Sequence, residues 1–190
     1  MNKRELDNLK NNLKKIYGYE NFRSGQESII KAILAKKNVL AVMPTGAGKS
    51  LCYQLPAILS DFSTIVISPL LALIDDQVAS LTALGLSVSS IHSGKDRETN
   101  IVEWKKFTSG FSKLIYMSPE RLMEERMINA LQKLNIGLFV IDEAHCISKW
   151  GPDFRPQYSE LSQLKKHFPN ATIAAFTATA DKATREDIVT

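Results

Sequence analysis

Five short runs along the chain are apolar at nearly every position and do not alternate with polar residues. They lie at residues 39–43, 65–67, 114–117, 136–141 and 172–176. Runs of this kind are typical of strands that are buried on both faces of a parallel sheet. A weaker run over residues 86–91 predicts a sixth strand nearer an edge of that sheet.

Helical patterns fill the intervals between these runs. In residues 71–84 four apolar positions recur at spacings of three and four, which places them on one face of a helix. Ser118 and Pro119 have the residue types of an N-cap and a first helical position, and they predict a helix that runs to about residue 134. The alternation predicts an α/β three-layer sandwich around a mainly parallel central sheet, with right-handed crossovers.

The composition fits one globular domain over residues 1–190. Hydrophobic residues make up 44% and charged residues 23%, which is close to the globular average and argues against disorder. The net charge of +4 says little about partners, because residues 1–40 carry the whole basic surplus and predict a solvated helical face. Cys52 and Cys146 have no second pair nearby and are expected to be small buried residues. With neither a signal-peptide core nor a run long enough for a membrane span, we expect a cytoplasmic protein.

Residues 43–50, MPTGAGKS, follow a predicted strand and precede the helical residues 51–59, which is the context of a phosphate-binding P-loop and predicts the P-loop NTPase fold. The glycines allow backbone N–H groups and the helix N-terminus to surround phosphate oxygens. Lys49 would neutralise β- and γ-phosphate charge, and the Ser50 hydroxyl would bind Mg²⁺. Met43 replaces the first glycine of the general pattern, and a glycine-rich turn without a ligand is the alternative. The other loop residues expected to contact the nucleotide are Pro44, Thr45, Gly46, Ala47 and Gly48.

An acidic pair follows the most apolar run, at residues 136–141. Asp142 is expected at the carboxyl end of that strand, where it can hold Mg²⁺ through water. Glu143 would orient and deprotonate the water that attacks the phosphate. The alternative is a zinc site that also uses His145 and Cys146. It is disfavoured, and no zinc is expected, because no paired Cys or His lies at ligand spacing elsewhere.

Two motifs carry a resemblance to superfamily 2 helicases. They are DEAH at residues 142–145 and FTATA at residues 176–180, each after an apolar run. The expected contact of His145 with Thr177 or Thr179 would couple the γ-phosphate to the nucleic-acid side. A GTPase base-reading motif of the Asn-Lys-x-Asp type is not found in the sequence.

Within that superfamily the chain resembles the RecQ family over about residues 13–180. Residues 17–26, YGYENFRSGQ, are similar to the family's motif 0. The resemblance implies that Tyr19 stacks on adenine, that Gln26 reads the polar edge of adenine and that Arg23 supports the nucleotide. The donor and acceptor of a glutamine amide suit the N6 and N7 groups of adenine.

The resemblance also implies a set of DNA contacts. Residues 66–78 and 116–122 are similar to motifs Ia and Ib, and residues 146–158 resemble the aromatic-rich loop that senses single-stranded DNA. Pro152 departs from the family pattern, which has His there, and this predicts weaker stimulation of ATP hydrolysis by DNA. The implied contact residues are Ser68, Pro69, Gln77, Ser118, Arg121, Trp150, Phe154 and Arg155.

The family implies that the chain is the first RecA-like lobe of an ATP-dependent 3′–5′ DNA helicase for repair and recombination. Its expected ligands are ATP, Mg²⁺ and single-stranded and duplex DNA, and a bacterial nucleoid-associated location is expected. Residues 1–22 would form a helix that leads into motif 0, and the second lobe and C-terminal domains are expected to lie outside this chain. Alone, it is expected to hydrolyse ATP poorly. The alternatives are an isolated nucleotide- and DNA-binding module and a DEAH-box RNA helicase.

Overall fold

The computed structural model describes residues 3–147, 155–179 and 182–189. Within these residues six strands form one sheet in the order β1-β6-β5-β2-β4-β3, and every neighbouring pair is parallel. The predicted α/β class and all six predicted strands are therefore confirmed, with the weakest strand, β3, at an edge as expected. The strands are β1 (Val39–Val42), β2 (Ser63–Ile67), β3 (Val88–Ile91), β4 (Leu114–Met117), β5 (Ile136–Ile141) and β6 (Thr172–Thr177).

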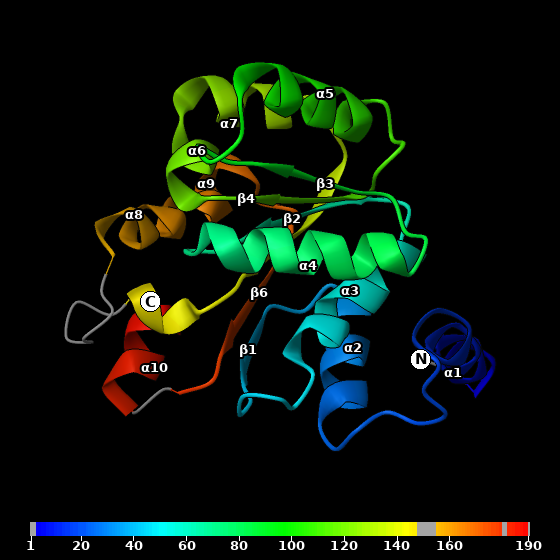
Figure 1. Cartoon of the computed structure of the whole chain (residues 1–190). Coiled ribbons are helices and arrows are strands. Elements are labelled where there is room, and N and C mark those ends of the chain that lie inside the picture. The colour runs from blue at the N-terminus through cyan, green and yellow to red at the C-terminus, as the bar shows by residue number, and fades with distance from the viewer. Residues whose placement is uncertain (1–2, 148–154, 180–181, 190) are drawn as a thin grey trace.

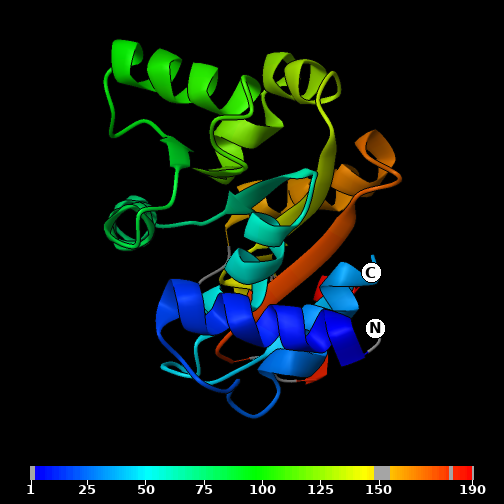
Figure 2. The same cartoon turned by 90° about the vertical axis from the view of Figure 1, so that its right-hand side faces the viewer.

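Helices cover both faces of the sheet, because alternate strand residues point to opposite sides (Figures 1 and 2). In β2, Ile65 and Ile67 belong to one core cluster and Val66 to the other. The cluster of Val66 is completed by α1 (Lys3–Tyr17), α2 (Gln26–Leu34), α3 (Lys49–Leu59) and α4 (Leu71–Ala83). The opposite cluster is completed by α5 (Arg97–Thr108), α6 (Pro119–Met123), α7 (Glu125–Leu131), α8 (Pro156–Ser159), α9 (Leu164–His167) and α10 (Lys182–Val189), with 3₁₀ turns η1 (Ala144–Ile147) and η2 (Glu160–Gln163).

The predicted continuous helix from Ser118 to about residue 134 is wrong. Glu124 has extended backbone angles, φ −58° and ψ 126°, and separates α6 from α7. The break lets Leu122 and Ile128 pack into the same core cluster, whereas one continuous helix would place them on different sides. Ser118 stands at the N-cap position, but its side chain makes no capping hydrogen bond.

The strand order divides the carboxyl edge of the sheet into two halves. The P-loop follows β1, Thr177 ends β6 and Asp142 follows β5, so these three adjacent strands bring the predicted nucleotide residues together. Ser68, Ser118 and His92 follow β2, β4 and β3, which make up the other half. Ligands bind at this edge in open parallel sheets.

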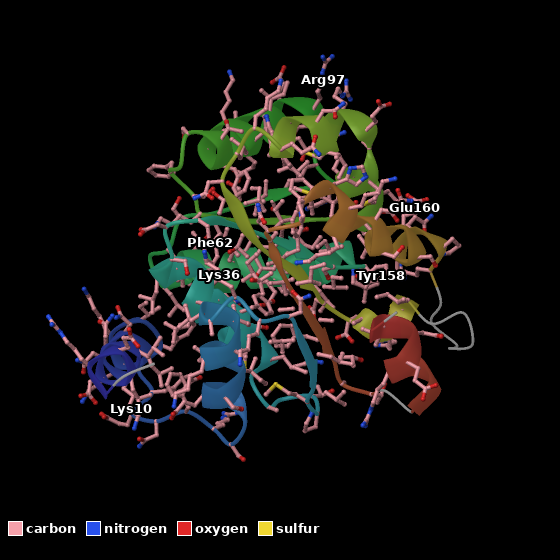
Figure 3. The ribbon with its side chains drawn as sticks, turned by 180° about the vertical axis from the view of Figure 1, so that it is seen from behind. Lys10, Lys36, Phe62, Arg97, Tyr158 and Glu160 are labelled. Atoms are coloured by element: carbon pink, nitrogen blue, oxygen red, sulfur yellow. The ribbon has the colours of Figure 1, made fainter. Side chains whose placement is uncertain are left out.

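The N-terminal helix α1 attaches to the sheet through its apolar stripe. Leu9 and Leu13 are buried beside α2, while the charged side chains of α1, Lys10 among them, lie at the periphery of the molecule (Figure 3). No helix in the described part of the chain is both long and apolar enough to cross a membrane.

Candidate nucleotide and nucleic-acid site

The P-loop connects β1 to α3 through two glycines in the left-handed region. Gly46 has φ +81° and Gly48 has φ +79°, angles that side chains other than glycine rarely adopt. A Cβ atom at Gly48 would also lie 2.5 Å from Nε2 of Gln26. Gly48 is the N-cap of α3, so its geometry sets the direction in which Lys49 and Ser50 leave the loop.

Motif 0 is hydrogen-bonded to the P-loop. Gln26 is buried; its Oε1 accepts from the Arg23 N–H at 2.9 Å, and its Nε2 donates to the carbonyl oxygens of Ala47 and Gly48 at 3.0 and 3.2 Å. The Arg23 guanidinium donates to the Gly46 carbonyl. These bonds hold motif 0 against the phosphate loop, and in this arrangement the Gln26 amide is directed to the loop carbonyls. The reading of adenine by Gln26 stays a prediction.

The acidic pair lies opposite the P-loop lysine. Lys49 Nζ is 3.6 Å from Glu143 Oε1, and the Asp142 N–H donates to the Ile67 carbonyl at 2.9 Å. Burial, followed by the charge of Glu143, raises the pKa of Asp142 to about 6. Two adjacent, half-buried carboxylates favour a bound cation, because a cation offsets the cost of keeping both ionised.

His145 contacts the end of β6, as the sequence predicts. Its Nδ1 is 3.0 Å from Thr177 Oγ1 and 3.3 Å from Glu143 Oε2. The Thr177 hydroxyl donates its proton to the Thr179 carbonyl at 2.8 Å, so it can only accept from the imidazole. Nδ1 therefore carries a proton, and His145 joins Glu143 to the Thr177–Thr179 turn.

A cavity of about 540 Å³ brings these elements together. It is also lined by Tyr17, Gln54 and Leu73, to which the sequence analysis assigns no role at the site. Gln54 follows Ser50 by one helical turn, a spacing that could have identified it. Pro44, Ala47 and His145 are not among the lining residues. The predicted site residues that line the cavity are Tyr19, Arg23, Gln26, Thr45, Gly46, Gly48, Lys49, Ser50, Asp142 and Glu143.

Gln77, predicted to contact DNA, lines this same cavity. Its Oε1 accepts from Gln54 Nε2 at 2.9 Å, and Gln54 Nε2 also donates to the Tyr116 hydroxyl at 3.1 Å. The Tyr17 hydroxyl donates to Gln54 Oε1 at 3.2 Å. One amide thus joins α1, α3, α4 and β4 at the nucleotide cavity.

The other predicted DNA contacts that the structure describes lie along the second half of the edge. Ser68 is buried, and its hydroxyl has no hydrogen-bond partner among the described residues. The Pro69 carbonyl accepts from the Arg155 guanidinium at 3.0 Å. Ser118 and Arg121 line a second cavity, of about 740 Å³. Trp150 and Phe154, like Pro152, lie outside the described residues.

The loop after β3 also borders that second cavity. His92 is buried; its Nε2 is 3.0 Å from Asp75 Oδ1, and its Nδ1 accepts from the Gly94 N–H at 3.2 Å. The Asn100 amide donates to the His92 and Lys95 carbonyls at 3.1 and 3.2 Å. This segment is a loop, and side chains of α4 and α5 hold it in place.

The oxygen donors of the site fit a hard divalent cation such as Mg²⁺. Ser50 and Asp142 both line the nucleotide cavity, and Mg²⁺ is usually held by one or two protein oxygens, phosphate and water. Nowhere in the described residues do three or more His, Cys, Asp or Glu side chains gather as metal ligands. The glycine loop and Lys49 fit a nucleotide phosphate in the same way.

The comparisons with known proteins agree with this geometry. Residues 23–188 match the family model described as DEAD/DEAH box helicase. The chain belongs to this family of helicase domains. The fold is also found in the crystal structure of the DUF1998 helicase MrfA bound to DNA, with TM-score 0.76 and 20% identity over 99% of this chain and 28% of that chain.

Among curated proteins, the chain is similar to RecQ helicases. It is 48% identical over 177 residues to the ATP-dependent DNA helicase RecQ of Haemophilus influenzae, covering 93% of this chain and 29% of that protein. It is 42% identical to the ATP-dependent DNA helicase Q-like 2 of Arabidopsis thaliana, covering 92% of this chain and 26% of that protein. The chain thus spans less than a third of these relatives.

Proposed function

We propose that this chain is the nucleotide-binding lobe of a RecQ-type ATP-dependent DNA helicase. The observation that carries the proposal is the cavity of about 540 Å³ in which the P-loop, motif 0 and the acidic pair meet. The similarity to named RecQ helicases supports the choice within the DEAD/DEAH family. With a second lobe, the whole protein would unwind DNA in the 3′–5′ direction.

In this proposal Glu143 orients the attacking water and takes its proton. Its carboxylate lies between Lys49 and His145, at 3.6 and 3.3 Å, so its position is defined from two sides. Lys49 offsets the charge that develops on the γ-phosphate. Mg²⁺ bound by Ser50 and Asp142 would supply further charge neutralisation. His145 relays the state of the site to Thr177.

The second half of the sheet edge is the proposed track for a single strand of DNA. Ser68, Ser118 and the loop at His92 follow three neighbouring strands, so a strand laid across β2, β4 and β3 meets each of them in turn. Main-chain and hydroxyl groups can hydrogen-bond to the sugar–phosphate backbone of DNA, and such contacts do not depend on the base sequence. Trp150 and Phe154 would add base stacking.

A Glu143→Gln variant of the full-length protein tests the proposal. General-base catalysis contributes about 10²- to 10⁴-fold, so kcat for ATP should fall at least about 100-fold while ATP binding is kept. Lys37→Ala, an exposed lysine after α2, is the control and should leave kcat unchanged. A Glu143→Gln protein with wild-type turnover would contradict the assignment.

The same assays distinguish the two other candidate functions, an isolated binding module and an RNA helicase, from a DNA helicase. An isolated binding module would bind ATP and DNA but show no turnover even as the full-length protein. An RNA helicase would be stimulated more by single-stranded RNA than by single-stranded DNA of equal length. The 190-residue chain alone should turn over slowly, because an arginine finger from a second lobe is worth about 10³ to 10⁵ in rate.

A further inference from the structure

Glu143 adopts a backbone conformation that is unusual for a side chain other than glycine. Its φ is +49°, in the left-handed region. Strain of this kind persists only where the surrounding structure holds it. Since the Glu143 carboxylate meets Lys49 and His145 from this backbone position, whatever holds the backbone also places the carboxylate.

The peptide that joins Asp142 to Glu143 is held at both of its polar ends. Its N–H donates to Oδ1 of Asp142 at 3.0 Å, and its carbonyl oxygen accepts from the Tyr158 hydroxyl at 3.0 Å. The carbonyl of Glu143 itself accepts from the Cys146 N–H at 3.0 Å. These hydrogen bonds fix the orientation of the peptide planes on both sides of Glu143.

Two hydrogen bonds hold the peptide between Asp142 and Glu143, and the one from the Tyr158 hydroxyl does not depend on whether a cation is bound. The proposed role of Asp142 in cation binding engages the same carboxylate that accepts from the Glu143 N–H. The Tyr158 hydroxyl lies in the protein interior, and the residue is fully buried. Burial raises the pKa of Tyr158, so the hydroxyl keeps its proton and remains a donor to the carbonyl.

Tyr158 is itself attached to both halves of the sheet edge. It lies in α8, next to the segment that follows β5 (Figure 3). Its N–H donates to the Arg155 carbonyl at 2.9 Å, and the Arg155 N–H donates to the Cys146 carbonyl at 3.0 Å. The Arg155 guanidinium reaches the Pro69 carbonyl, in the proposed DNA half. Arg155 and Tyr158 therefore connect Pro69 to the Asp142 peptide.

We propose that Tyr158 is a positioning residue for ATP hydrolysis, whose hydroxyl holds the Asp142 carbonyl and so keeps Glu143 in its left-handed conformation. This inference rests on the proposed function. Without the hydroxyl, the peptide can rotate and Glu143 can relax toward ordinary helical angles, which moves the carboxylate from the attacking water. Nucleotide binding does not use this peptide and should be unaffected.

The test is a Tyr158→Phe variant of the full-length protein, which removes one hydroxyl and keeps the ring. Loss of one hydrogen bond corresponds to a fall in kcat of about three- to tenfold. KM for ATP and the affinity for a non-hydrolysable ATP analogue with Mg²⁺ should stay within about twofold. Leu161 is buried in the same core cluster, so Leu161→Ala controls for lost stability. Assayed well below its unfolding temperature, this variant should keep the wild-type kcat.

A double-mutant cycle shows whether Tyr158 acts through Glu143. In a Glu143→Gln background, the Tyr158→Phe change should cause no further loss of the residual rate. A kcat within twofold of wild type for Tyr158→Phe would overturn the inference, as would an equal loss in Leu161→Ala or a further loss in the Glu143→Gln background. A wild-type protein without ATP turnover would instead overturn the proposed function.

Discussion

Replacing Asp142 by Asn should stabilise the protein in the absence of nucleotide and metal. The Asp142 carboxyl is partly buried and lies next to Glu143, and both effects raise its pKa in the folded state from 3.8 to about 6. A carboxyl whose folded pKa is raised binds its proton more tightly in the folded state than in the unfolded state. Stability is therefore lost as the pH rises from about 4 to about 6, and the full cost is present above that window.

The size of this cost follows from the pKa difference. A rise of about 2 pKa units, at about 1.4 kcal/mol for each unit, gives about 3 kcal/mol of destabilisation above pH 6. Asn cannot ionise, and its Oδ1 can still accept from the Glu143 N–H, a bond of 3.0 Å in the wild-type protein. For a domain of this size, about 3 kcal/mol corresponds to a rise in Tm of about 6–12 °C.

Thermal unfolding of both proteins between pH 3.5 and 8, in EDTA and without nucleotide, measures the effect. The gain in Tm of Asp142→Asn should be largest above about pH 6.5 and should vanish below about pH 4. Asp61→Asn, which changes an exposed carboxylate near Lys113, is the control and should show no such pH dependence. An Asp142→Asn protein that is no more stable than wild type at pH 7.5, or whose gain is independent of pH, would refute the reasoning.

Three further changes test other parts of the site. Gly48→Ala should abolish binding of a fluorescent ATP analogue, because its Cβ would lie 2.5 Å from Gln26 Nε2 and φ is +79°. Gln54→Leu and Gln77→Leu should be non-additive by about 0.5–2 kcal/mol in a double-mutant cycle of urea unfolding, since the two amides share a 2.9 Å hydrogen bond; additive losses would contradict the contact. Pro152→His should increase the stimulation of ATPase by single-stranded DNA, and an unchanged ratio of stimulated to basal rates would count against the role given to Pro152.

The strands could be predicted because strands buried on both faces have apolar residues at nearly every position. β5 and β2 lie inside the sheet with helices on both faces, so their residues are apolar without alternation. β3 has two serines between Val88 and Ile91, and its weaker pattern matched its place at the edge. The glycine loop could also be predicted from the local sequence, because a positive φ at Gly46 and Gly48 and close packing at Gly48 require glycine.

The features that the sequence could not reveal depend on contacts between distant segments. The break at Glu124 lets α6 and α7 pack on one core cluster, an arrangement that helical propensity does not encode. Gln77 was assigned to DNA on the resemblance alone, whereas its partner Gln54 belongs to a different helix. Glu143 is helix-favouring as a residue type, so its left-handed backbone is not expected from the sequence, and the peptide before it is held by the distant Tyr158 hydroxyl.

In the proposed function, the division of the sheet edge defines where a signal from DNA to ATP would have to cross. The proposed nucleotide half ends at β5 and the proposed DNA half begins at β2, and these are neighbours in the sheet. Besides the β2–β5 ladder and the hydrogen bonds of Gln54, two links among the described residues join the DNA half to Asp142. They are the bond from the Asp142 N–H to the Ile67 carbonyl, and the path from Pro69 through Arg155 and Tyr158 to the Asp142 carbonyl. The first link joins two strand ends, whereas the second passes through Arg155 and Tyr158, which belong to the segment that resembles the aromatic-rich loop. In the proposed function, a strand of DNA that displaces Pro69 or Arg155 would therefore act, through Tyr158, on the peptide that orients Glu143.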